Sequence, residues 1–142
     1  MATFLGSAAL AGSPAKGATQ SGQEVVVYGS YELEAALALN DVIEMIKVPE
    51  NATVLGVTLI TDDVDTATGI VLDVGDGDDT DRYIDGSTLG QTGGISDPSD
   101  MQVAGIGHTY TTPDTIDVLV QVAPGTGTTS GTVALIARYI TP

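Results

Sequence analysis

The stretch "ATVLGVTLITDD", residues 52–63, decides the fold class. Its even-numbered residues from Val54 to Ile60 alternate with the odd-numbered ones from Leu55 to Leu59, and nearly all of them are apolar or β-branched. A period of two is that of a β-strand, because successive side chains of a strand point to opposite faces of its sheet. The stretch therefore predicts a long strand that ends in a pair of aspartates.

Similar segments fill most of the chain after residue 23. They span residues 24–33, 41–49, 69–77, 108–124 and 131–140. Turn-forming sequences such as "PEN", "DGDD", "DPSD" and "PGTGTTSG" separate them, and the chain holds 18 glycines and 6 prolines. Short apolar runs between frequent turns are typical of a β-sandwich or a β-barrel. The fold class is therefore predicted to be all-β.

One segment, "YELEAALALNDVIEMI" (31–46), also fits a helix, because it is rich in helix formers and Leu33, Leu37 and Ile43 could share a face. However, apolar residues also alternate from Tyr31 onward, and Asn40 with its neighbouring aspartate makes a good turn. We favour two strands here and keep the helix as the alternative.

Composition restricts the classes of function. The chain has 142 residues, which points to one domain, and it has no cysteine. Nineteen acidic residues face four basic ones, for a net charge of −15. This charge argues against binding nucleic acid or an anionic membrane surface, since both attract Lys and Arg. No segment reaches the roughly 18 consecutive apolar residues of a membrane-spanning helix.

The first 23 residues differ from the rest, because they are mainly Gly, Ala, Ser and Thr. Phe4, Leu5 and Leu10 are the sizeable apolar side chains among them. Such a stretch buries too little surface to order itself. We predict a flexible N-terminal arm at 1–23, which orders on a partner through these three residues, and a β-sandwich domain at 24–142. The alternative is a plain disordered tail. Lys16 follows the apolar run, so we expect no cleaved signal peptide.

The segment "DVGDGDDTDRYID" (73–85) contains six aspartates. Read as a calcium loop from Asp76, it has Thr80 at position 5, but Asp81 at position 6 and Ser87 at position 12, where the EF-hand needs a glycine and a glutamate. That signature fails. Asp76, Asp78 and Asp81 remain candidate ligands of a different cation site, to which "TDDVD" (61–65) could add. We favour a hairpin with a solvated acidic tip.

No catalytic set is recognisable. Paired carboxylates of glycosidases work in clefts rich in aromatic residues, yet the chain has no Trp. His108 is the single histidine, no G-x-S-x-G elbow occurs, and no Lys follows the glycine-rich "GTGTTSG" (125–131). We therefore expect a structural or interaction protein without a cofactor, and not an enzyme.

The sequence resembles the small head decoration (cement) proteins of tailed bacteriophages. The resemblance rests on "DVIEMIKVPENATVLGVTLITDD" (41–63), "GIVLDVGDGDDTDRYIDGST" (69–88) and "YTTPDTIDVLVQVAPGTGTTSGTVALIARYI" (110–140). These segments share with such proteins a style of sequence rather than a sharp fingerprint.

The resemblance implies a jelly-roll-like β-sandwich with an extended N-terminal arm. It also implies a homotrimer, made in the host cytoplasm, that sits on the outer capsid surface of the virion and clamps neighbouring major capsid protein subunits. The arm would make the clamp through Phe4, Leu5 and Leu10. The alternatives are a tail, neck or head-fibre component of the virion, and a secreted carbohydrate- or calcium-binding β module.

Overall fold

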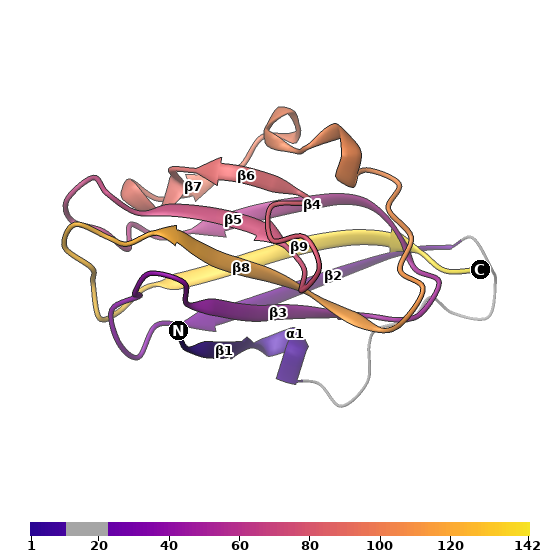
Figure 1. Ribbon diagram of the computed structural model, residues 1–142, viewed down its shortest axis with the longest axis horizontal. Coiled ribbons are helices and arrows are strands. Elements are labelled where there is room, and N and C mark those ends of the chain that lie inside the picture. Colours follow the sequence, from indigo (N-terminus) through magenta and orange to yellow (C-terminus); the bar gives the residue numbers. More distant parts are fainter. Residues whose placement is uncertain (11–22) are drawn as a thin grey trace.

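The computed structural model describes residues 1–10 and 23–142, which form two packed β-sheets (Figure 1). The five-stranded sheet has the order β1-β3-β8-β5-β6, and the four-stranded sheet has the order β2-β9-β4-β7. The strands are β1 (Thr3–Gly6), β2 (Glu24–Glu32), β3 (Val42–Val48), β4 (Thr53–Thr61), β5 (Val71–Gly75), β6 (Ile84–Ser87), β7 (Gly94–Ile95), β8 (Asp114–Val122) and β9 (Thr132–Ile140). The helical elements are α1 (Ser7–Leu10), η1 (Leu89–Gln91), η2 (Pro98–Asp100) and η3 (Val103–Gly105).

The strand pairing from β2 to β9 is that of a jelly roll. The first of these strands pairs with the last, β3 pairs with β8, β4 with β7, and β5 with β6, all antiparallel. This is the pattern of one long hairpin that has rolled up into two sheets. The predicted all-β, jelly-roll-like sandwich is confirmed.

The core lies between the two sheets and is filled by alternate residues of the strands. Val25, Leu59, Leu72, Ile116 and Leu135 are among its buried side chains. The sheets approach closely at Gly29, where an added Cβ would lie 2.7 Å from the backbone oxygen of Met45. None of the helices in the described residues is long and apolar enough to cross a membrane.

The segment 31–46 forms neither the helix nor the first of the two expected strands. Strand β2 ends at Glu32, residues 33–41 are irregular, and β3 begins at Val42. Leu33 and Leu37 are buried although they lie on no regular element. The chain crosses here from one sheet to the other, so burial in the core takes the place of strand pairing. The predicted turn does occur, since Asn40 has a φ of 66°.

The N-terminal segment differs from the expected free arm over its first ten residues. Strand β1 pairs in parallel with β3, and α1 follows directly and packs beside β2 and β3 (Figure 1). The backbone N–H of Val42 donates to the oxygen of Ala2, and the backbone N–H of Ser30 donates to Oγ of Ser7. An edge of the sandwich thus supplies the hydrogen bonds that a segment of this composition cannot supply itself. The rest of the predicted arm, residues 11–22, lies outside the described residues.

Candidate functional site

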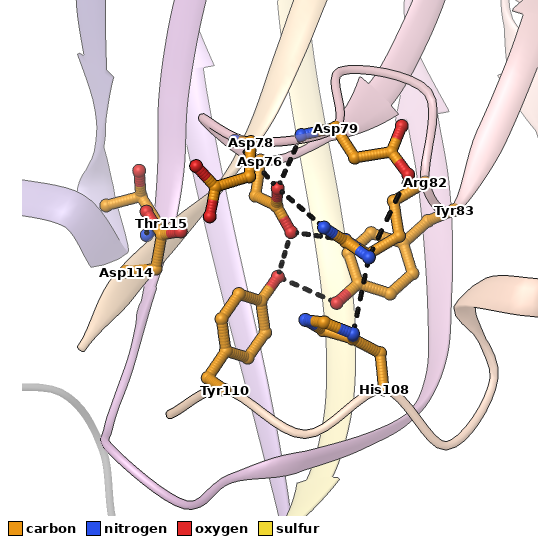
Figure 2. Close-up of polar contacts among 9 residues, drawn as sticks. All are labelled: Asp76, Asp78, Asp79, Arg82, Tyr83, His108, Tyr110, Asp114 and Thr115. Atoms are coloured by element: carbon orange, nitrogen blue, oxygen red, sulfur yellow. Dashed lines mark hydrogen bonds and ion pairs between the residues drawn. The ribbon is translucent and has the colours of Figure 1, made fainter. Parts of the chain in front are cut away.

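Asp76 is the centre of the aspartate-rich loop, which connects β5 to β6. Its carboxylate accepts hydrogen bonds from the backbone N–H groups of Asp78 and Asp79, at 3.1 and 2.9 Å. Nε of Arg82 donates to it at 2.6 Å and the hydroxyl of Tyr110 at 2.9 Å (Figure 2). Burial alone would raise the pKa of Asp76, but the hydrogen bonds from Arg82 and Tyr110 outweigh burial and lower it.

The network extends across the end of the sandwich. The hydroxyls of Tyr83 and Tyr110 lie 2.7 Å apart, and Nη1 of Arg82 lies 3.3 Å from Nδ1 of His108. The rings of His108 and Tyr110 meet edge to face (Figure 2). The network ties the loop after β5 to the segment that leads into β8. His108 has a structural place in it, as a lone histidine usually does.

The three candidate metal ligands do not converge. The carboxylate of Asp76 is occupied by Arg82, Asp78 is exposed, and Asp81 is half-buried. In the described part of the chain, no three His, Cys, Asp or Glu side chains form a group that could hold a metal ion. The loop is a hairpin connection held by its own arginine. Asp76 at its centre is buried, not solvated as expected, whereas Asp78 is exposed.

Asp65, which the sequence offered only as a further cation ligand, connects two loops. It is fully buried and accepts hydrogen bonds from five backbone N–H groups, those of Ala67, Gly69, Ile70, Gly125 and Thr126. Burial opposes its ionisation, yet these five donors keep its pKa far below the usual range. Two of the donors lie about sixty residues away along the chain. The sequence therefore gives only a weak signal of this role, namely an aspartate two residues before a turn.

The outer face of the five-stranded sheet is acidic. Glu44 of β3 lies directly opposite Asp117 of β8. Asp73 of β5 lies on the same side of the sheet but is buried, and its carboxylate accepts a hydrogen bond from the backbone N–H of Gly86 at 2.8 Å. A hollow of about 250 Å³ lies over the pair of Glu44 and Asp117, and Oδ1 of Asp117 is buried without a hydrogen-bond partner. Burial, together with the carboxylates of Glu44, Asp114 and Asp76, raises the pKa of Asp117 to about 7. We call this surface the acidic face.

The outer face of the four-stranded sheet carries a group of apolar side chains, next to which Glu24 and Arg138 form an ion pair at 2.6 Å. The strand register places Tyr28 beside Ile136, and Ile60 beside Ile95. Val26, Tyr28 and Ile95 are 60%, 56% and 66% exposed. We call the surface formed by Val26, Tyr28, Ile60, Ile95 and Ile136 the apolar face.

The residues expected to anchor the arm have separate surroundings. The ring of Phe4 lies 5.3 Å from that of Tyr31 and packs against the core, so Phe4 already has an apolar partner within the chain. Leu5, the next residue of β1, is 41% exposed. The side chain of Leu10 lies outside the described residues. Phe4 therefore orders on its own domain, and not on a separate partner as expected.

Three solved structures that resemble this fold are chains of bacteriophage capsids. A chain from the capsid of Ralstonia phage GP4 superposes with a TM-score of 0.83 at 25% identity, over 99% of both chains. A chain of the capsid asymmetric unit of cyanophage Pam1 gives 0.67 at 30% identity, over 94% of this chain and 96% of that one. A chain of the acidic stable capsid of Helicobacter pylori bacteriophage KHP30 gives 0.50 at 19% identity over 84% of this chain, which shows the fold alone.

No protein-family model matches the chain, and no curated protein matches it significantly. The evidence of kinship therefore comes from the solved capsids. Two of them match at 25% and 30% identity and align with this chain almost end to end, without a large insertion or a second domain. The chain belongs to the β-sandwich chains of bacteriophage capsids and is a structural protein of the virion.

Proposed function

We propose that the chain is a decoration protein, which binds the outside of a phage capsid as a homotrimer and stabilises contacts between major capsid protein subunits. The observation that carries the proposal is the likeness to the Ralstonia phage capsid chain over 99% of both chains. One capsid-type domain accounts for nearly the whole chain, so its work is done by its surfaces rather than by an enclosed site.

Charge supports a place on the outer surface. The net charge of −15 would bring repulsion next to packaged DNA, whose phosphates attract Lys and Arg. Two of the four basic residues, Arg82 and Arg138, are engaged in ion pairs with carboxylates of the same chain. A surface with this negative charge is compatible with solvent outside the shell.

The N-terminal segment remains our candidate for a contact with the shell, but Phe4 and Leu5 have different roles in it. Leu5 presents an exposed side chain to a partner, whereas Phe4 holds β1 on the domain through Tyr31. One fully buried leucine contributes about 1.5–3 kcal/mol. Three such contacts on one trimer act together and gain avidity through effective concentration.

A pelleting experiment tests the proposal. Purified protein is mixed with capsids that lack it, and the capsids are sedimented at low and high salt. We expect the protein to pellet with the capsids, and Leu5→Ser to pellet less while melting at the temperature of the wild type. Wild-type protein that stays in the supernatant, or that pellets with isolated tails but not with capsids, contradicts the decoration role.

A further inference from the structure

The apolar face is one continuous surface across the sheet. Tyr28 on β2 pairs with Ile136 on β9, which pairs in turn with Thr58 on β4. One step along the strands, Ala134 lies beside Ile60, which lies beside Ile95 on β7. Apolar side chains thus extend over all four strands from one edge of the sheet to the other.

The core does not require these side chains. The alternate residues of the same strands, such as Val25, Leu59 and Leu135, point inward and are buried between the sheets. Single exposed apolar residues are common on protein surfaces, but a connected group of them marks an interaction surface.

Charge indicates which partner fits this surface. The strands of the four-stranded sheet carry two acidic residues and one base, and two of these, Glu24 and Arg138, pair with each other at 2.6 Å. The strands of the five-stranded sheet carry five acidic residues and one base, Lys47. A second copy of the chain also carries −15, so it meets strong repulsion on the acidic face and very little on the apolar face.

We propose that the apolar face is the surface on which a second copy of this chain docks. The inference rests on the homotrimer of the proposed function and names the surface that builds it. Tyr28, on the edge strand β2, is its main anchor, because it is the largest exposed side chain of the apolar face and an aromatic ring buries the most surface on contact. The shell protein then contacts other surfaces of the trimer.

The test compares Tyr28→Glu with Val103→Glu. Both substitutions add one carboxylate at an exposed apolar residue, but Val103, 85% exposed, lies in η3 and not on the strands that form the apolar face. Sedimentation over a range of concentrations gives the mass of each variant, and thermal melting reports its fold. We expect Tyr28→Glu to raise the dissociation constant of the oligomer roughly tenfold or more. We expect Val103→Glu to match the wild type.

The outcomes separate this inference from the decoration role. A folded Tyr28→Glu with the mass of the wild type at every concentration overturns the inference, as does a wild type that is itself a monomer. If Tyr28→Glu keeps its mass but no longer pellets with capsids, the apolar face belongs to the shell protein and the inference fails. If the wild type is an oligomer that Tyr28→Glu dissociates, and neither pellets with capsids, the docking surface stands and the decoration role fails. Should Tyr28→Glu melt early, Val26→Ser, at a 60% exposed residue of the same face, replaces it in every comparison.

Discussion

The two outer faces of the sandwich are built by the same alternation of residues, yet they differ in chemistry. The acidic face places Glu44 opposite Asp117 and leaves an oxygen of Asp117 without a partner. The apolar face places Tyr28 beside Ile136, with its main ion pair, Glu24 to Arg138, satisfied within the chain. In a chain with 19 acidic residues, the sheet whose strands carry two of them is the informative one. A free acidic surface favours solubility, whereas an apolar one requires a partner.

The largest expected effect is on stability. It concerns Asp76, whose carboxylate holds the loop at the end of the acidic face. We expect Asp76→Ala to lower the free energy of unfolding by about 2–4 kcal/mol, because Arg82 and Tyr110 lose their common acceptor in a buried place. Chemical denaturation measures the change. Asp78→Ala is the matched control, since this exposed aspartate lies in the same loop. Equal losses from both substitutions would mean that the network around Asp76 contributes nothing of its own.

The next largest effect is a gain in stability and concerns Asp117. The pKa of Asp117 is raised to about 7 by burial and by nearby carboxylates, whereas an aspartate in an unfolded chain titrates near 3.9. The folded protein thus keeps a proton that the unfolded chain loses between about pH 4 and pH 7. This contribution to stability is therefore lost as the pH rises through that range.

Asp117→Asn removes this dependence, because its amide stays neutral at every pH. We expect the variant to be more stable than the wild type by about 1–2 kcal/mol above pH 7, a value reduced for the partial exposure of the site. The difference should shrink toward pH 4. Denaturation curves at several pH values give both stabilities. A variant that is less stable than the wild type at pH 8 would show that the charged carboxylate is satisfied.

A smaller effect tests whether the acidic pair is coupled. We expect Glu44→Gln to lower the pKa of Asp117 by up to about one unit, since one of the neighbouring charges that raise it is removed. Titration of the Asp117 carboxyl by NMR follows this change. Glu50→Gln, an exposed glutamate beyond the end of β3, is the control. An unchanged pKa would leave burial and the carboxylates of Asp114 and Asp76 as the causes of the shift.

The smallest effect is expected on the apolar face. Tyr28→Ser should change the stability of the dissociated chain by less than about 0.5 kcal/mol, because this half-exposed ring takes no part in the core. The measurement is denaturation at concentrations where the wild type is dissociated. A loss of 2 kcal/mol would assign Tyr28 to folding and weaken its role as a docking anchor.

The sequence predicted those parts of the fold that depend on local pattern. The strand through Val54 and Leu59 follows from alternation alone, and so does the fold class. Strand β1 was missed because Thr3 to Gly6 is too short for a pattern and is held by a distant neighbour, β3. The short strands β6 and β7 were missed for the same reason.

The site was less predictable, because the role of a carboxylate depends on distant residues. Nothing near Asp65 in the sequence reveals that Gly125 and Thr126 donate to it, and nothing near Asp76 reveals Tyr110. The sequence does predict that acidic residues cluster between 73 and 85. It does not predict which of them are buried, nor that the strands of one sheet carry only two acidic residues.

The most direct test of the account is cryo-electron microscopy of capsids saturated with the purified protein. We predict density outside the shell, with three copies around each binding site and the apolar face of each copy, including Val26 and Tyr28, covered by a neighbouring copy. The acidic face should lie away from the other copies. Protein on the inner surface of the shell, or single copies whose apolar face is open to solvent, would contradict the account.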